Sequence, residues 1–212
     1  MTRGAHVAAA EPPAGPAPSS RVVALPAGGG DDATLVSRAV GGDRWAEEAI
    51  YRRHMRPIAN LVLRLLRNRA EMDDAVQDTF VAAFEHLGAL RDGAALRAWL
   101  AQIAVSQVRR RLRRRRLLGL LGLDRTVEDA TLEALASAGQ PAEARAELGA
   151  LDRLLATLPD EQRIAWMLRH VEGEELEDVA RACSCSLATV KRRIAAADAR
   201  VHLHVTLKEA AS

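Results

Sequence analysis

Residues 71–116 read EMDDAVQDTFVAAFEHLGALRDGAALRAWLAQIAVSQVRRRLRRRR, and two helical patterns lie within them. Residues of the first pattern recur at the spacing of one helix face, which predicts that they pack inward: Ala75, Val76, Thr79, Phe80, Ala83, Phe84 and Leu87. At about 100° per residue, the opposite face gathers acids and amides around one aliphatic residue: Asp74, Gln77, Asp78, Val81 and Glu85. Acidic helix faces are often only solvated, but this composition also suits docking to a partner.

The second pattern follows a predicted break at residues 88–93. It places apolar side chains on one stripe and then becomes strongly basic, with seven arginines in the ten residues 107–116. The stripe consists of Leu96, Trp99, Leu100, Ile103 and Ala104. An arginine run is sometimes a solvated helix end or a flexible linker, but one this dense favours contact with a polyanion.

The composition indicates an all-α protein. Aromatic residues make up 3% of the 212 residues, alternating β-branched runs are scarce, and Ala, Leu, Arg and Glu are abundant. The formal net charge of +2 conceals a segregation of arginines at 109–116 from acids at 124–152. No apolar run reaches the roughly 18 residues of a membrane span or forms the core of a signal peptide, so we expect a cytoplasmic protein without membrane insertion.

The two cysteines, Cys183 and Cys185, are separated by one residue. Neighbours at this spacing rarely form a disulfide, because their side chains diverge, and we expect them to be small apolar fillers in a reducing compartment. A metal would need further ligands, for which His202 and His204 are the nearby candidates. We expect no metal site and no cofactor.

Changes in composition divide the chain into five segments. We expect a disordered Ala/Pro/Gly-rich tail at 1–31, a helical domain at 32–116, an acidic linker at 117–145, a second helical domain at 146–205 and a C-terminal tail at 206–212. The start of the linker, 117–123, has an alternative interpretation as a short helix that docks on a partner.

Four local predictions concern the first part of the first domain. Asp31 or Asp32 caps a short helix through Ala39, and Asp43 caps the next helix after a glycine pair. Pro57 marks a kink or a junction within residues 45–68. Two arginines, Arg64 and Arg67, lie on the outer side of the apolar stripe that follows it.

In the second domain, residues 176–182, 183–186 and 187–200 predict helix, tight turn and helix. Ser186 is placed to cap the second helix. Polar and basic residues then occupy its exposed N-terminal half, the part that enters the major groove in DNA-binding versions of this motif: Thr189, Lys191, Arg192 and Arg193. The alternative is a structural helical hairpin with solvated basic residues.

The two blocks together resemble a known family. Asp74-Ala-Val-Gln77-Asp78-Thr-Phe80 and Arg97-Ala-Trp99-Leu100-Ala-Gln-Ile103-Ala104, followed by the basic helix end, resemble the second conserved domain of extracytoplasmic-function (ECF) sigma factors, the small promoter-recognition subunits of bacterial RNA polymerase. Leu158-Pro159-Asp-Glu-Gln-Arg163, Asp178-Val-Ala180 and Ala188-Thr189-Val190-Lys191-Arg-Arg193 are similar to their fourth conserved domain.

The resemblance implies a non-enzymatic factor that binds core RNA polymerase and promoter DNA and directs promoter melting and transcription initiation at a specific regulon. Contacts with the clamp helices of the largest subunit would come from Asp74, Gln77 and Asp78, with Phe80 supporting that surface. The melted −10 element would meet Trp99, Ser106, Arg109, Arg110 and Arg113. The −35 duplex would meet Thr189, Lys191, Arg192 and Arg193. An anti-sigma factor is a further implied partner, because many ECF sigma factors have one.

The sequence departs from the family pattern at several positions. Val105-Ser106 stands where an asparagine often follows the Ile-Ala pair, Ala188 where glycine is usual, and Arg192 where a small serine is common. Residues 195–198 replace a stretch that commonly carries an arginine able to reach DNA, and Asp198 there would repel phosphate. Promoter specificity is therefore not carried over from the family.

Two other functions fit parts of the sequence. A free-standing helix-turn-helix regulator explains the second domain but leaves the acidic face at 74–85 unused. A helical protein-protein adaptor leaves the basic run merely solvated and predicts no salt-dependent DNA binding. An enzyme is disfavoured, because the sequence has no phosphate-cradling glycine loop and its histidines are scattered.

Overall fold

The structure is a computed structural model that describes residues 30–122 and 141–210. Within these two ranges all regular structure is helical and no strand occurs, which confirms the all-α prediction. Residues 1–29 of the predicted tail (1–31) and residues 123–140 of the predicted linker (117–145) lie outside the described residues. Below, residues 30–122 are called the N-terminal half and residues 141–210 the C-terminal half.

The first helix, α1 (Asp32–Val40), is capped by the side chain of Asp31, which accepts a hydrogen bond from Thr34 N at 2.9 Å. A glycine pair ends it, and Gly42 adopts a positive φ of 87°. The following helix, α2 (Arg44–Leu66), is capped by Asp43, which accepts from Trp45 N at 2.9 Å. Both predicted caps are confirmed, with Asp31 rather than Asp32 in the first.

Of the two predicted alternatives at Pro57, a kink or a junction, the junction is wrong, because α2 runs unbroken from Arg44 to Leu66. Pro57 lies on the exposed side of the helix, while its apolar stripe is buried: Ile58, Leu61, Val62, Leu65 and Leu66. Burial of that stripe holds the helix together across the missing hydrogen bond. Arg67, which caps the C-terminal end of α2, is in the left-handed conformation with φ 56°.

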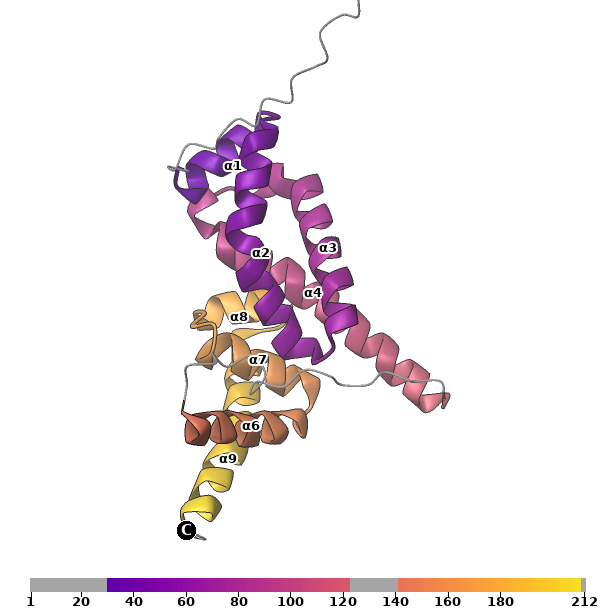
Figure 1. The fold of residues 1–212 in the computed structure, drawn as a ribbon, viewed down its shortest axis with the longest axis vertical. Helices are drawn as coiled ribbons and strands as arrows, with labels where there is room; N and C mark the ends of the chain where they lie inside the picture. Colours follow the sequence, from indigo (N-terminus) through magenta and orange to yellow (C-terminus); the bar gives the residue numbers. More distant parts are fainter. Residues whose placement is uncertain (1–29, 123–140, 211–212) are drawn as a thin grey trace, which may run out of the picture.

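Next come α3 (Arg69–His86), two short 3₁₀ turns (Leu87–Ala89 and Gly93–Ala95) and α4 (Leu96–Leu120). The predicted inward face of α3 is buried apart from Phe84, which is half-buried. Gly93 packs so tightly on α1 that an added Cβ would lie 2.5 Å from Ala33 Cα, so only glycine fits there. Helix α4 extends about one turn beyond the predicted domain end at residue 116, and its C-terminal end projects from the molecule (Figure 1).

The C-terminal half consists of α6 (Ala142–Ala156), α7 (Asp160–His170), α8 (Leu176–Ala182) and α9 (Leu187–Ala210). Its first helix begins four residues before the predicted boundary at 146. The two halves lie end to end in Figure 1, with α8 packed against α4 and α7 against α2. Buried residues of both halves form one continuous apolar cluster.

Two arginines at the end of α2 were expected on its outer side, and this prediction is wrong. Arg67 is buried and Arg64 is half-buried, because both turn toward the C-terminal half. Arg64 pairs with Glu172, and Arg67 with Asp152. The sequence of α2 alone cannot reveal a partner that lies about a hundred residues further along the chain.

Candidate functional site

The outer face of α3 is largely exposed, as predicted. Asp74, Gln77, Glu85 and Val81 face solvent, and Val81 is 51% exposed although it is aliphatic. Asp78 differs from the others, because Arg110 and Arg111 of α4 lie 3.0 and 2.7 Å from its Oδ2. Its charge is therefore largely matched within the chain.

Phe80 lies beneath this face and is only 3% exposed. Its ring packs edge-on against Tyr51 of α2 at 4.8 Å between centroids, and Phe84 lies 6.1 Å away. Phe80 thus supports the surface and does not form it, in line with the role the resemblance implies.

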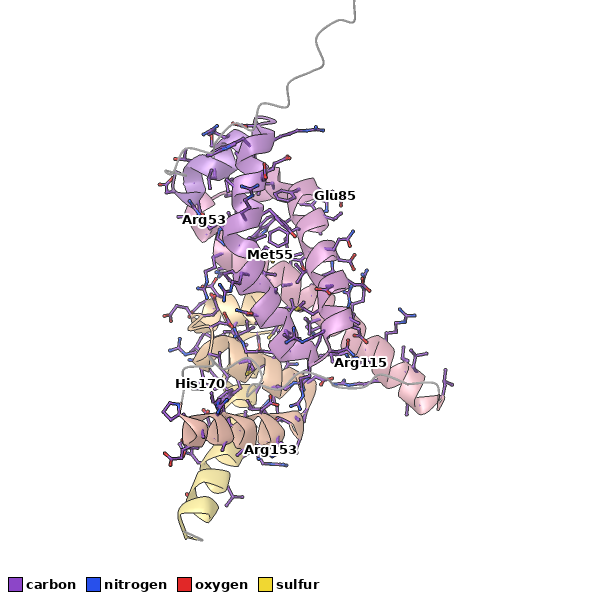
Figure 2. The ribbon with its side chains drawn as sticks, in the orientation of Figure 1. Arg53, Met55, Glu85, Arg115, Arg153 and His170 are labelled. Carbon is purple, nitrogen blue, oxygen red and sulfur yellow. The ribbon has the colours of Figure 1, made fainter. Side chains whose placement is uncertain are left out.

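Between α2 and α3 runs an open groove of about 490 Å³ that the sequence did not predict. Figure 2 labels Met55 on the α2 side of it and Glu85 on α3. Its lining is mainly apolar, with polar residues at the α3 rim: Tyr51, Met55, Ala59, Met72, Asp73, Val76, Gln77, Phe80, Val81 and Phe84. We call this the α2/α3 groove. The sequence did carry one sign of this groove: Tyr51, Met55 and Ala59 recur every four residues and therefore form one stripe on α2.

The residues of α4 expected to contact a melted strand do not all face the same way. Trp99, Ser106 and Arg113 recur every seven residues, with Arg110 beside them, so they share one side of the helix. Ser106, Arg110 and Arg113 are exposed and Trp99 is half-buried. Arg109 turns instead toward the C-terminal half, where its Nε lies 3.2 Å from Glu161 Oε1.

Several arginines of the run at 109–116 are paired within the chain. Arg115 donates to Glu71 Oε1 at 3.1 Å and to the carbonyl oxygen of Leu66 at 3.1 Å. Arg116 Nη2 lies 2.6 Å from Asp160 Oδ2. The run is therefore not simply a solvated helix end, because α3 and α7 supply carboxylates to it.

The helix-turn-helix forms from α8 and α9 where it was predicted. Ser186 Oγ accepts from Thr189 N at 3.2 Å and lies 2.9 Å from Thr189 Oγ1, so the predicted cap is confirmed. Lys191 and Arg192 are exposed. Arg193 is half-buried, because its Nη1 lies 3.1 Å from Glu161 Oε2 and 3.3 Å from Cys185 Sγ.

Asp198, the last residue of the stretch 195–198 that departs from the family pattern, has a structural role. Its Oδ1 accepts from Trp166 Nε1 at 2.9 Å and lies 3.3 Å from His170 Nε2, so it joins α9 to α7. Its carboxylate therefore takes part in the packing of the two helices, while its side chain remains 35% exposed.

The two cysteines are free, and Cys183 is fully buried. Burial raises the pKa of the Cys183 thiol to about 12, with a smaller contribution from Cys185. Among residues 30–122 and 141–210, no group of three or more His, Cys, Asp or Glu side chains is arranged to hold a metal ion. Over the same ranges, no helix has the length and apolar character needed to cross a membrane.

A helical half with an open apolar groove and an arginine-rich helix, followed by a helix-turn-helix, has the organisation of a transcription factor. Comparison with known families agrees: residues 50–117 match the model of Sigma-70 region 2, and residues 148–200 match that of Sigma-70 region 4. The ECF RNA polymerase sigma factor SigM of Mycobacterium tuberculosis is 33% identical over 170 residues, which cover 80% of this chain and 82% of SigM. The RNA polymerase sigma-H factor of Pseudomonas aeruginosa is 32% identical over 172 residues, covering 77% of this chain and 88% of the relative.

Two solved structures share the fold. CnrH in complex with the cytosolic domain of CnrY is 24% identical with a TM-score of 0.58, covering 83% of this chain and 97% of CnrH. The sigma factor RpoE in complex with the anti-sigma factor NepR from Bartonella quintana is 23% identical with a TM-score of 0.61, covering 75% of this chain and 96% of RpoE. The chain belongs to the ECF sigma factors, and its function is promoter-specific transcription initiation by RNA polymerase.

Proposed function

We propose that the chain docks on core RNA polymerase through the α2/α3 groove. The observation that carries this proposal is an apolar groove left open on the surface, with exposed Val81 and Tyr51 at its edges. An exposed apolar patch framed by polar residues is typical of a protein-protein interface. Gln77, which lines the groove, and Asp74, which is exposed on the outer face of α3, supply polar contacts to the clamp helices of the largest subunit.

Asp78 and Phe80 have supporting parts in this proposal. Asp78 orients Arg110 and Arg111 beside the docking face, and Phe80 holds α3 at a fixed distance from α2. Tyr51 and Met55 join the set of proposed contacts, because they line the same groove.

Two further surfaces bind promoter DNA. We assign the melted −10 element to Trp99, Ser106, Arg109, Arg110 and Arg113 of α4. An aromatic ring beside a cationic groove is the combination that binds single-stranded nucleic acid without reading a duplex. We assign the −35 duplex to Thr189, Lys191, Arg192 and Arg193 near the start of α9, where a recognition helix presents its side chains to the major groove.

The chain acts by binding alone, with polymerase supplying the chemistry, and it works in the cytoplasm. The RpoE structure is a complex with the anti-sigma factor NepR, and an anti-sigma factor is the corresponding proposed partner here. A free-standing regulator would leave the α2/α3 groove unused. An adaptor would leave the exposed basic residues of α9 unused.

The experiment is copurification with core polymerase and promoter-dependent transcription in vitro. Asp74→Arg combined with Gln77→Arg abolishes core binding while helical content stays unchanged. The matched control, Ser37→Arg with Glu177→Arg, adds the same charge at exposed positions outside the groove and leaves binding intact. Retention of the Asp74→Arg/Gln77→Arg variant on core enzyme would show that the docking face lies elsewhere.

A further inference from the structure

The C-terminal end of α4 carries the most exposed large apolar side chains among the described residues. Leu117, Leu120 and Leu121 are 63%, 85% and 70% exposed. The helix end that carries them projects from the molecule, beyond the point at which Figure 2 labels Arg115. We call residues 117–121 the α4 tip. None of the surfaces described above for polymerase or promoter DNA uses these leucines.

Exposed arginines lie behind the leucines on the same side of the helix. The members of this row recur at spacings of three and four and are all exposed: Arg110, Arg113, Arg114, Leu117, Leu120 and Leu121. Arg110 pairs with Asp78, but within residues 30–122 and 141–210 no carboxylate pairs with Arg113 or Arg114. One side of α4 therefore has a basic part followed by an apolar end.

The charges around the α4 tip leave it attractive to an anionic surface. Residues 93–123 contain no Asp or Glu. The carboxylates that reach this part of α4 from neighbouring helices are each paired with an arginine: Glu71 with Arg115, and Asp160 with Arg116. No unpaired carboxylate of α4 itself therefore opposes an anion that approaches the tip.

This combination favours a lipid surface over other partners. Exposed apolar patches of this kind mark contacts with a protein or a membrane. A nucleic-acid backbone would engage the arginines but leave the leucines in water. A second copy of the chain would bring two groups of arginines together, and such like charges repel. An anionic lipid surface suits both parts, because its headgroups attract arginine and its acyl chains accommodate leucine.

The spacing along the helix matches the depth of a lipid surface. With a rise of about 1.5 Å per residue, Leu120 and Leu121 lie about 10 Å beyond Arg113 and Arg114 along the helix axis. Apolar residues of membrane-surface helices enter the boundary between headgroups and acyl chains by about 5–10 Å. Long arginine side chains keep their charged ends at the level of the headgroups while apolar neighbours lie deeper.

We propose that the α4 tip is a membrane-surface contact that binds anionic phospholipid. Leu117, Leu120 and Leu121 enter the headgroup region, and Arg113 and Arg114 bind the lipid phosphates. Only the end of the helix takes part, so the contact is peripheral and reversible. The inference goes beyond the proposed function, because neither polymerase docking nor promoter binding needs a lipid.

The first test is sedimentation of the full chain with vesicles. One set of vesicles contains equal parts of phosphatidylglycerol and phosphatidylcholine, and the other contains phosphatidylcholine alone. We expect binding to the anionic vesicles and binding weaker by at least about tenfold to the neutral ones, because the arginines lose their anionic partners. Equal binding to both sets, or binding to neither, would overturn the proposal.

A double substitution tests the apolar part of the contact. Leu120→Ser combined with Leu121→Ser removes two exposed leucines, and the control, Val171→Ser with Leu203→Ser, removes two exposed aliphatic side chains of the C-terminal half. We expect the tip variant to lose more than about tenfold in affinity for the anionic vesicles, because the buried apolar area is lost. The control keeps its affinity. Equal losses would show that the chain binds vesicles without using the α4 tip.

A single substitution tests the basic part. Arg114→Gln removes one arginine behind the tip, and Arg56→Gln removes the same charge from an exposed position of α2. At low salt we expect about a fivefold loss of affinity for the first variant and no loss for the second. Matching losses would mean that net charge attracts the vesicles, which would overturn the assignment to α4.

The leucine variant also distinguishes the other possible occupants of the tip. Copurification measures binding to core polymerase, and sedimentation velocity without lipid measures self-association. We expect Leu120→Ser/Leu121→Ser to match the unaltered chain in both. Loss of core binding would assign the tip to polymerase, and a change from dimer to monomer would assign it to a second copy, so either result would overturn the proposal. Failure of the proposed function is seen separately, as absence of core copurification by the unaltered chain.

Discussion

Arg67 and Asp152 form a buried ion pair that connects the end of α2 to α6. Arg67 Nη1 lies 3.0 Å from Asp152 Oδ2 and donates to the carbonyl oxygen of Asp152 at 3.0 Å. Both side chains are more than nine-tenths buried. Arg67 also holds a left-handed backbone conformation that ordinarily favours glycine. The position therefore combines backbone strain with a charge that the C-terminal half neutralises.

Removal of one partner of this pair is expected to be costly. Asp152→Ala leaves the Arg67 guanidinium buried without its carboxylate, and we expect a loss of about 3 kcal/mol in the free energy of unfolding measured with urea. The double variant Arg67→Met/Asp152→Ala loses less than the sum of the single changes, because no charge remains buried. Additive losses would show that the two residues do not interact.

The left-handed backbone at Arg67 can be tested separately from the ion pair by comparing two substitutions. Arg67→Ala and Arg67→Gly both remove the guanidinium, but only glycine relieves the positive φ. We expect the glycine variant to be more stable than the alanine variant by about 1 kcal/mol. Equal stabilities would mean that Arg67 does not adopt the left-handed conformation in solution.

Two residues that line the α2/α3 groove have different proposed roles: Val81 contacts the polymerase, and Phe80 supports the surface. Val81→Asp places a charge on an exposed position, so we expect core-polymerase binding to fall more than tenfold with a change in unfolding free energy of less than about 0.5 kcal/mol. Phe80→Ala empties a buried site, so it destabilises the fold by about 3–5 kcal/mol. Binding by pull-down and thermal unfolding distinguish the two. Wild-type affinity of Val81→Asp would remove Val81 from the interface.

Residues whose environment is local could be predicted from the sequence. The cap of Asp43, the inward face of α3 and the helix-turn-helix with Ser186 at its start depend on spacing within about ten residues, and all three are confirmed. The exposed acidic face of α3 follows from the same periodicity. These features are dictated by helix geometry alone.

Residues whose environment is created by segments distant along the chain could not be predicted. Arg67, Arg109 and Arg193 each have the sequence context of an exposed basic residue, yet each faces a carboxylate distant along the chain. Pro57 illustrates the same limit, because tertiary burial of the α2 stripe overrides its local helix-breaking effect. The α2/α3 groove forms between two helices, so the sequence pattern of either helix alone does not reveal it.

Acid should weaken the attachment of α1 to α2. Asp32 lies 2.7 Å from Arg53 Nη1 and 3.1 Å from His54 Nε2. Burial raises the pKa of Asp32, but hydrogen bonds from Arg53 and His54 outweigh it and hold the pKa below its ordinary value of 3.8. Because the folded pKa is lowered, this carboxylate stabilises the fold above pH 3.8, and the contribution is lost as the pH falls through the lower folded value.

Asp32→Asn tests this dependence. At pH 7 the variant is less stable than the unaltered chain, and the difference shrinks as the pH falls below 3.8 toward the lowered folded pKa, below which the aspartate is protonated in both states. Urea unfolding from pH 7 to pH 3 measures it. A difference that stays constant over this range would mean that the contribution of Asp32 does not depend on its charge.

The two thiols should react at different rates. Cys183 is fully buried with a pKa raised to about 12, so it is almost entirely protonated at pH 8, whereas Cys185 is half-buried. We expect a thiol reagent to modify one cysteine rapidly in the folded chain and both in urea, as counted by mass spectrometry. Cys185→Ser abolishes the rapid phase. Rapid modification of Cys183 in that variant would show that α8 and α9 open readily.

The exposed basic residues of α9 should set the salt dependence of duplex binding. Lys191→Ala combined with Arg192→Ala removes two cations that face solvent, so we expect weaker binding and a slope of log K against log salt that is smaller by about one for each lost phosphate contact. The control, Arg44→Ala with Arg153→Ala, removes the same charge from exposed positions of α2 and α6; Figure 2 labels Arg153 on α6. Anisotropy titrations over a range of salt concentrations measure both slopes. If the control changed the slope as much as the α9 variant, the effect would come from net charge and α9 would not be the duplex-binding helix.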